Sequence, residues 1–276
     1  MVLLDNYGRP TLNLRVAVTQ NCNLRCGYCH REGELGIPSS REMSVEEIVR
    51  VVRAAISLGI SRVKLTGGEP LYRKDIVDIV AGINRLRGLL DLAMTTNGCF
   101  LASLAKDLKA NGLKRVNVNI PTLDSETYRD LTAGGDLRNV IEGIMEAVRV
   151  GLFPAKLNMV LLRGVNTGEV ERMIEFAERT GAILQLIELE PINVSEEYYG
   201  KHHFELGDIE ERLKKQAYEV KTRRRMQDRR VYFLPSVKVE VVHPIENTEF
   251  CRHCTRLRVT SDGKLKPCLM RNDNVV

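Results

Sequence analysis

Residues 22–30 read Cys22-Asn23-Leu24-Arg25-Cys26-Gly27-Tyr28-Cys29-His30, and this stretch decides both the fold and the chemistry of the chain. Its three cysteines follow the spacing C-x3-C-x2-C. A zinc site usually takes four ligands in two close pairs, and a four-iron cluster held by cysteine normally takes one thiolate per iron. Three thiolates in one tight loop therefore favour a cluster that leaves one iron open to a small molecule. The alternatives are a zinc loop or three unrelated thiols.

Cysteine usage elsewhere supports metal chemistry. The first ten residues lack the apolar length of a signal peptide, and no segment approaches the roughly 18 apolar residues of a membrane helix. We therefore expect a cytoplasmic protein without a membrane partner, in which cysteines serve metals or catalysis and not disulfides. Of seven cysteines among 276 residues, six form two groups of three. The seventh, Cys99, is expected to be a buried and inert thiol.

The second group is Cys251-Arg252-His253-Cys254, followed by Cys268 after thirteen intervening residues. Three thiolates again favour a four-iron cluster with an open iron. A zinc site with His243 or His253 as fourth ligand is the alternative.

Cationic side chains accompany both cysteine groups. Arg256 and Arg258 point to one face if they lie in a strand, where two guanidinium groups suit bidentate phosphate binding. An exposed strand face with two charges is the ordinary alternative. Arg15 lies on the more polar face of the first predicted strand, and inside a barrel its charge requires an anion or a buried carboxylate such as Glu188. The net charge of +5 is mild and suits an anionic substrate.

A local basic run, residues 223–230, contains five arginines. Such a run can contact RNA, but it is more often the solvated face of a hairpin. We therefore expect no nucleic-acid partner.

Short β-rich runs alternate with amphipathic helical stretches between residue 12 and about residue 190. Ser44-Val45-Glu46-Glu47 fits a capping box that begins the first helix. Strands are predicted at 12–19, 62–66, 92–96, 115–120, 156–162 and 183–189, and further helices at 75–86, 101–110, 139–150 and 169–180. Six βα-type units predict a parallel sheet with helices outside it but fall short of the eight of a full barrel. We expect an α/β fold, an open partial (β/α)6 barrel of the TIM type.

The pattern changes after residue 191. Residues 193–201 are polar and are interpreted as a loop, 208–216 as a helix and 237–242 as a strand. Strands at 256–260 and 264–266 flank the turn Ser261-Asp262-Gly263. We therefore expect a barrel domain over residues 1–192 and a β-rich C-terminal segment over residues 193–276 that carries the second cluster.

Further polar motifs follow the predicted strands, and ligands of parallel sheets gather at this end. Thr66-Gly67-Gly68-Glu69-Pro70 lets the backbone approach a ligand closely, although Gly-Gly is also a common turn. Thr95-Thr96-Asn97-Gly98 offers hydroxyl groups or is an ordinary turn. Asn119 can bond a ribose or a carboxylate, and Lys156 can meet a phosphate or lie at the surface.

Together these residues resemble the molybdenum cofactor biosynthesis protein A family of GTP 3′,8-cyclases, in the radical S-adenosylmethionine (SAM) superfamily. The likeness covers nearly the whole chain, and the run Cys29-His30-Arg31-Glu32-Gly33 resembles the archaeal branch. The first cysteine motif is specific only to the superfamily. The second, with its two arginines and Ser261-Asp262-Gly263, indicates this family.

The resemblance implies two [4Fe-4S] clusters, SAM as cofactor, GTP as substrate and no catalytic residue beyond the cluster ligands. Cluster 1 would be held by Cys22, Cys26 and Cys29, and cluster 2 by Cys251, Cys254 and Cys268. SAM would contact Tyr28, Gly68 and Asn119. GTP would contact Arg15, Lys64, Thr95, Lys156, Arg256 and Arg258.

The implied reaction is reductive. The first cluster would give one electron to SAM, which would split to methionine and a 5′-deoxyadenosyl radical that takes the C3′ hydrogen of GTP. The ribose radical would attack C8 of guanine, and the second cluster would donate the final electron. The product is (8S)-3′,8-cyclo-7,8-dihydroguanosine 5′-triphosphate, a precursor of molybdopterin. An electron donor and the next enzyme of the pathway are the implied partners. The rival interpretations are another twin-cluster radical SAM enzyme acting on a peptide or tetrapyrrole, and a non-catalytic metal-binding relative.

Several positions differ from the bacterial pattern. Lys64 occupies a position where bacterial members usually have an arginine, and a lysine cannot form the bidentate contact of a guanidinium group. Asn119 replaces a serine, and Glu190 replaces a methionine. Gln185 replaces an arginine and carries no charge, so we assign it no role in binding. Members of the family normally end in a Gly-Gly tail that enters the active site, and we expect the C-terminal segment, which ends at Val276 soon after Cys268, to lack this tail.

Overall fold

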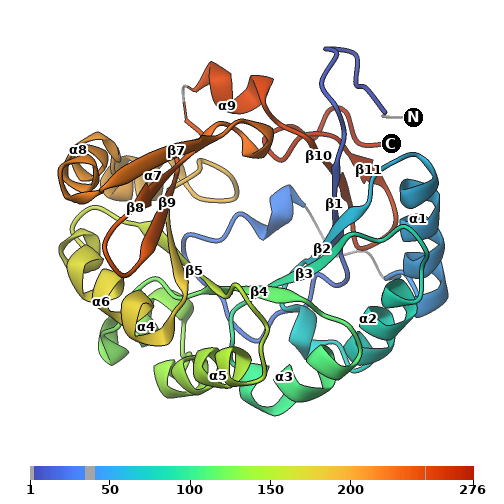
Figure 1. Cartoon of the computed structure of the whole chain (residues 1–276), viewed down its shortest axis with the longest axis horizontal. Helices are drawn as coiled ribbons and strands as arrows, with labels where there is room; N and C mark the ends of the chain where they lie inside the picture. Colours follow the sequence, from blue (N-terminus) through green and yellow to red (C-terminus); the bar gives the residue numbers. More distant parts are fainter. Residues whose placement is uncertain (1–2, 35–40, 246) are drawn as a thin grey trace.

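One curved sheet organises the protein, whose computed structural model describes residues 3–34, 41–245 and 247–276. Within these residues the sheet has eleven strands in the order β11-β10-β1-β2-β3-β4-β5-β6-β9-β8-β7. The strands wrap into an incomplete barrel with helices around its outside (Figure 1). No helix among the described residues is long and apolar enough to cross a membrane.

The parallel strands of the barrel lie side by side in chain order, which confirms the predicted α/β partial barrel. They are β1 (Asn13–Ala17), β2 (Arg62–Thr66), β3 (Asp91–Thr96), β4 (Arg115–Asn119), β5 (Lys156–Leu161) and β6 (Ile183–Glu188). Their outward side chains, with Leu14, Leu65 and Leu157 among them, are fully buried under the helices. The inward side chains are mostly polar, because a barrel interior that binds a ligand needs polar contacts.

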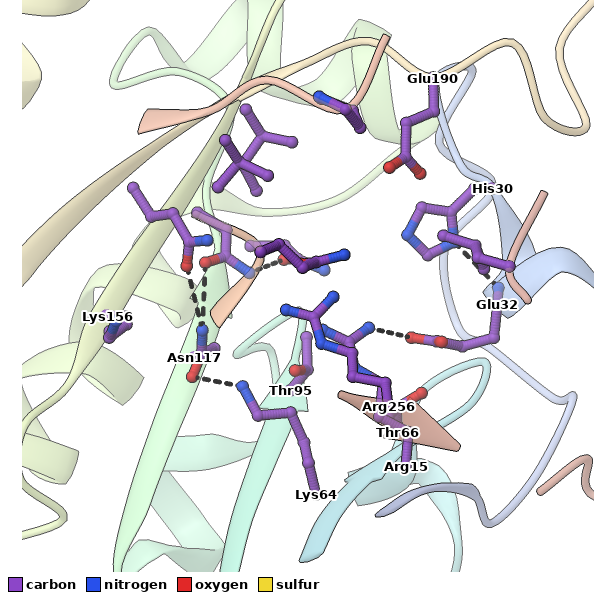
Figure 2. A pocket seen from close by; sticks show the side chains of 18 of the residues that line it. Arg15, His30, Glu32, Lys64, Thr66, Thr95, Asn117, Lys156, Glu190 and Arg256 are labelled. Atoms are coloured by element: carbon purple, nitrogen blue, oxygen red, sulfur yellow. Dashed lines mark hydrogen bonds and ion pairs between the residues drawn. The ribbon is translucent and has the colours of Figure 1, made fainter. Parts of the chain in front are cut away.

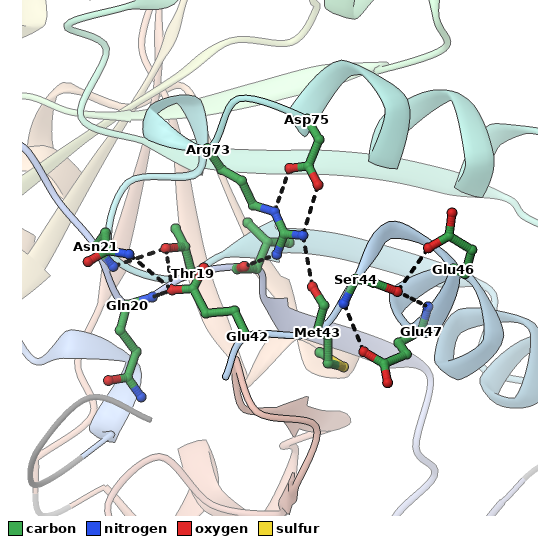
Figure 3. Close-up of polar contacts among 11 residues, drawn as sticks. Thr19, Gln20, Asn21, Glu42, Met43, Ser44, Glu46, Glu47, Arg73 and Asp75 are labelled. Carbon is green, nitrogen blue, oxygen red and sulfur yellow. Dashed lines mark hydrogen bonds and ion pairs between the residues drawn. The ribbon is translucent and has the colours of Figure 1, made fainter. Parts of the chain in front are cut away.

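The helices of the outer layer are α1 (Val45–Ser57), α2 (Ile76–Asn84), α3 (Leu101–Ala110), α4 (Ser125–Thr132), α5 (Leu137–Arg149) and α6 (Val170–Thr180). The capping box predicted for α1 is present: Ser44 Oγ accepts a hydrogen bond from the amide of Glu47 (3.2 Å), and Glu47 Oε2 accepts one from the amide of Ser44 (2.9 Å; Figure 3). Helix α4 was not predicted, because its sequence is short and polar.

The C-terminal segment extends the sheet at both edges. Strand β9 (Lys238–Val242) runs parallel to β6 and is followed in the sheet by β8 (Arg229–Phe233) and β7 (Glu219–Arg223). At the other edge, β10 (Arg256–Val259) runs parallel to β1 and pairs with β11 (Leu265–Lys266) in the predicted hairpin. The segment therefore reaches both sides of the barrel opening.

One sequence prediction for this segment is wrong. Residues 193–201, interpreted as a loop, contain helix α7 (Glu196–His202), and α8 (Gly207–Gln216) and α9 (Thr248–Arg252) follow. Ser195 caps α7 with its side chain, which accepts from the amide of Tyr198, and charges of the favourable sign occupy both end turns. The helix buries no side chain, so it shows no apolar periodicity that would have revealed it.

The entry to the first cysteine loop is held against the end of β2. The amides of Gly68 and Glu69 donate to the carbonyl oxygens of Thr19 (2.7 Å) and Asn21 (2.8 Å). Glu42 accepts from Thr19 Oγ1 (2.7 Å), and Arg73 donates to the carbonyl of Val18 (Figure 3). These contacts fix where the cysteine loop begins.

We predict that Gly67→Ala destabilises the protein. Gly67 has φ +138, and a Cβ there would overlap the carbonyl oxygen of Thr19. We expect a loss of about 1–3 kcal/mol in the free energy of unfolding, the usual cost of overpacking, measured by chemical denaturation. Gly168→Ala is the matched control, because nothing lies within 4 Å of its Cβ position. Equal stability of the two variants would contradict this role of Gly67.

Candidate active site

A cavity of about 780 Å³ occupies the barrel interior, and the two cysteine groups lie on its wall. The segment after β1, drawn in blue, crosses the mouth of the barrel and brings Cys22, Cys26 and Cys29 to it (Figure 1). Helix α9 and the segment after β11 bring Cys251, Cys254 and Cys268 to the same cavity. Every site residue predicted from the sequence lines this one cavity.

The sheet register explains why so many polar side chains meet there. Successive residues of a strand point to opposite faces, so residues paired across parallel strands share a face. Arg15 pairs with Arg258 on one side and with Lys64 on the other. Thr95 pairs with Asn117, and Asn117 pairs with Lys156. Figure 2 shows these side chains converging on one space from different strands.

The cavity is strongly cationic. Thirteen Lys or Arg side chains line it, against six Asp or Glu side chains. Because a buried charge without a partner is costly, an excess of this kind calls for anions from outside the chain.

Glu32 neutralises part of this charge. Its side chain lies 3.4 Å from Arg15 Nη1 and 4.0 Å from Arg258 Nε (Figure 2). Burial alone raises the pKa of Glu32, but Arg15, His30 and Arg258 lower it to about 2. The predicted alternative partner of Arg15, Glu188, is wrong, because Glu188 binds His203 and His243 instead.

Glu240 neutralises a second part of the positive charge in the cavity. It is buried and pairs with Lys156 Nζ at 2.5 Å and with Arg223 Nη1 at 2.8 Å. Lys156 is therefore not the surface lysine that the sequence left open. Burial lowers the pKa of Lys156 to about 8, against the opposing effect of Glu240.

Seven cavity cations have no carboxylate within 4.0 Å among the described residues, and three of these seven are shielded from solvent: Lys64, Arg229 and Arg256. Burial, together with Arg15 and other cations nearby, lowers the pKa of Lys64 and of Arg256 well below their usual range. Figure 2 shows Arg15 and Arg256 lying next to each other with Lys64 below them. These are the groups that gain most from a bound anion.

A row of amides continues the wall beside Lys64. Lys64 Nζ donates to Asn117 Oδ1 (3.0 Å), and Asn117 Nδ2 donates to Asn158 Oδ1 (3.3 Å) and Gln185 Oε1 (3.5 Å). Asn158 Nδ2 in turn donates to Asn119 Oδ1 (2.9 Å). Amides offer both donors and acceptors, so this row suits the hydroxyl and ring-nitrogen atoms of a nucleoside.

The first cysteine loop leaves its thiols accessible. Cys22 and Cys29 are exposed and Cys26 is partly exposed, all three as free thiols. Burial of the sulfur, with the other thiols nearby, raises the pKa of Cys26 to about 12, so metal binding at this loop must release protons. Asn97 Nδ2 lies 3.8 Å from Cys22 Sγ and donates to Asn23 Oδ1 (2.8 Å), which ties the loop to the end of β3.

Neither triplet forms a site for a single metal ion. Among the residues that the structure describes, no three His, Cys, Asp or Glu side chains gather closely enough to hold one ion. A tetrahedral zinc site brings all its ligands within bonding distance of one atom, whereas a four-iron cluster receives each thiolate on a different iron. The donor sets of three thiols each therefore fit a cluster better than zinc. His253 Nδ1 lies 3.0 Å from the carbonyl oxygen of Glu249, which can accept a hydrogen bond from it.

Comparison with known proteins identifies the family. Residues 16–177 match the model of the radical SAM superfamily, and residues 182–276 match that named Molybdenum Cofactor Synthesis C. A protein named "Probable GTP 3',8-cyclase" from Thermococcus kodakarensis is 50% identical over 100% of this chain and 90% of its own length. One of the same name from Archaeoglobus fulgidus is 47% identical over 99% and 91%. The chain belongs to the GTP 3′,8-cyclase family of the radical SAM superfamily.

Solved structures share the fold of this cyclase-family chain. Streptococcus suis SuiB bound to the precursor peptide SuiA superposes with a TM-score of 0.71 at 17% identity, over 96% of this chain and 61% of SuiB. The structure of anSMEcpe with bound AdoMet superposes with a TM-score of 0.66 at 18% identity, over 96% and 76%. At this identity the likeness concerns the fold alone.

Three charged residues that line the cavity were not predicted from the sequence. Glu32 and Glu240 were not singled out, although both neutralise cavity cations. Arg229 was interpreted as part of a solvated hairpin face, yet it is only 8% exposed and lines the cavity. The available signal was the spacing of two residues between Arg229 and the buried Val231, because alternate residues of a strand share a face.

Glu69 of the Gly-Gly-Glu-Pro motif is a buried carboxyl at the edge of the cavity. It accepts from Thr96 Oγ1 (2.6 Å), from the amide of Asn97 (2.6 Å) and from the amide of Leu71 (2.9 Å). Burial nevertheless raises its pKa to about 7. The carboxyl thus joins the ends of β2 and β3, and the amides of Gly68 and Glu69, which bond the cysteine loop, are not free to bind a ligand.

We predict that Glu69 makes stability depend on pH. An unfolded chain releases this proton near pH 4.3, whereas the folded protein holds it until about pH 7. The folded state therefore loses stability as pH rises through this window. Glu69→Gln removes the titration, so the stability of the variant minus that of the wild type should rise by about 1 kcal/mol from pH 6 to pH 8. A constant difference in urea unfolding across this range would contradict the assignment.

Proposed function

We propose that this protein is a GTP 3′,8-cyclase, which converts GTP to (8S)-3′,8-cyclo-7,8-dihydroguanosine 5′-triphosphate in molybdenum cofactor biosynthesis. The observation that carries the proposal is that two separate cysteine triplets open onto one cavity whose charged side chains are mostly cationic. A substrate with several negative charges fits between them. A peptide or a tetrapyrrole lacks a triphosphate, whose closely grouped anionic oxygens suit neighbouring guanidinium groups.

The cysteines would hold the cofactors. Cys22, Cys26 and Cys29 would bind one [4Fe-4S] cluster with SAM beside it, and Cys251, Cys254 and Cys268 would bind the second. When bound, these groups supply reductive radical chemistry, which no side chain of the protein can perform alone. Tyr28, Gly68 and Asn119 line the same cavity and would contact SAM.

The chain's own residues bind and orient the nucleotide. Arg15, Lys64, Lys156, Arg256 and Arg258 would bind the triphosphate, with Thr95 beside them, because charge-assisted bonds from fixed guanidinium groups are strong and directional. Burial of these groups excludes water from the reacting ribose and base. Holding C3′ and C8 close together is the main contribution of the protein to such a cyclisation.

Two partners complete the proposal. An electron donor must reduce the bound cofactors, and the next enzyme of molybdopterin synthesis consumes the product. We place the reaction in the cytoplasm, because seven free cysteines suit a reducing compartment.

We predict that GTP increases SAM cleavage. The protein is reconstituted anaerobically with iron and sulfide, and 5′-deoxyadenosine is measured with SAM and a reductant, with and without GTP. Formation of 5′-deoxyadenosine should be higher with GTP than in buffer without GTP. The iron content should approach about eight atoms per chain. Cys99→Ser is the matched control for the cluster cysteines and should leave both values unchanged, whereas Cys22→Ser should abolish cleavage.

Other results would separate the rival functions. No rise with GTP would contradict the cyclase. SAM cleavage that responds to a peptide instead would favour another twin-cluster enzyme. If SAM is not cleaved although the protein has its full iron content, a non-catalytic relative is favoured. If the protein contains about one zinc ion per chain in place of part of the iron, the second cluster is contradicted.

A further inference from the structure

We propose that Arg229, in the C-terminal hairpin β7–β8, is an additional binding residue for the phosphate chain of the nucleotide; this inference rests on the function proposed above. It gives a role to the basic run 223–230, which neither the cysteine motifs nor the strand-end motifs explain. The hairpin would form a further cationic wall of the cavity, opposite the barrel strands that carry Lys64 and Arg15.

The sheet register directs Arg229 into the cavity. Gln185 on β6 pairs with Glu240 on β9, and Glu240 pairs with Val231 on β8, so these residues share the inner face. Arg229 lies two residues from Val231 on the same strand and therefore points to that face as well. It lines the cavity and is only 8% exposed, whereas its neighbour Arg230 is exposed on the outer face.

The guanidinium group of Arg229 is not neutralised. Its Nη2 donates to the neutral Gln227 Oε1 at 2.8 Å, and its Nε has no hydrogen-bond partner in the described part of the chain. The charges of Glu240 and Glu190 act on Arg229, but neither forms an ion pair with it within 4.0 Å, and Glu240 already pairs with Lys156 and Arg223. A buried guanidinium with an unused donor and no ion pair is a site that an anionic ligand would complete.

The turn before β8 holds Arg229 in this position at a cost. Gln227 and Asp228 both have positive φ, 65 and 55, a conformation that is strained for non-glycine residues and that clusters at ligand clamps. The amide of Gln227 donates to the carbonyl of His253 (3.2 Å), and Thr255 Oγ1 donates to the carbonyl of Arg225 (3.1 Å). The turn is thus fastened to the loop that carries Cys251 and Cys254.

A purely structural cation behaves differently. If Arg229 served only to neutralise Glu240, its removal would destabilise the protein without ligand. If it awaits an anion, removal relieves an uncompensated buried charge, so the ligand-free protein keeps or gains stability while the response to phosphate is lost. Stability and affinity together therefore separate the two roles.

The test compares Arg229→Gln with Arg230→Gln in the anaerobically reconstituted full chain. The two residues are adjacent on β8 but face opposite sides, and Arg230 pairs with Glu210 (3.6 Å) on the outer side. Dissociation constants are measured by calorimetry for GTP and for inorganic tripolyphosphate. We expect Arg229→Gln to weaken both at least about ten-fold, the effect of one charge-assisted hydrogen bond, and Arg230→Gln to change neither by more than about two-fold.

Melting temperature without ligand supplies the second readout, and it should be unchanged or higher in Arg229→Gln. Wild-type affinity for both ligands in this variant, or a lower melting temperature with unchanged affinity, would overturn the inference. Arg229→Lys keeps the charge without the fork and should give intermediate affinity, which decides the matter if the glutamine variant does not fold. Failure of the wild type to bind GTP would contradict the proposed cyclase, while the tripolyphosphate measurements still decide the contact of Arg229.

Discussion

Uncompensated positive charge inside the barrel is the constraint on which the rest of the site depends. Thirteen cationic and six acidic side chains line one cavity, and Lys64, Arg229 and Arg256 find no carboxylate there among the described residues. Keeping such groups together without a ligand lowers their pKa values and costs stability. The hydrophobic layer between sheet and helices must supply the stability that this arrangement consumes.

The arrangement is possible because the sheet receives C-terminal strands at both edges. Strand β10 lies against β1, and strands β9 and β8 follow β6. The chain therefore passes around the opening and places its second cysteine triplet on the cavity that the first triplet already lines (Figure 1). Glu32 and Glu240 each hold two cations in place, so the cationic wall is ordered before any ligand binds.

Much of the fold and of the candidate site could be predicted from the sequence, because local patterns of residues carry that information. Alternating strand and helix periodicity predicts the barrel, and cysteine spacing predicts two separate cluster triplets. Contacts between distant segments were not predictable. Glu32 pairs with an arginine more than two hundred residues away, and Arg229 depends on the register of three strands. Helix α7 escaped prediction because capping and end charges stabilise it and no buried face marks it.

The most direct measurement of the central claim is the affinity of the reconstituted protein for GTP compared with guanosine, as a function of salt. If the cavity is built around its unpaired cations, GTP should bind at least about a hundred-fold more tightly than guanosine, since several charge-assisted bonds depend on the phosphates. That ratio should shrink as salt rises. Equal affinities of GTP and guanosine, independent of salt, would contradict the account.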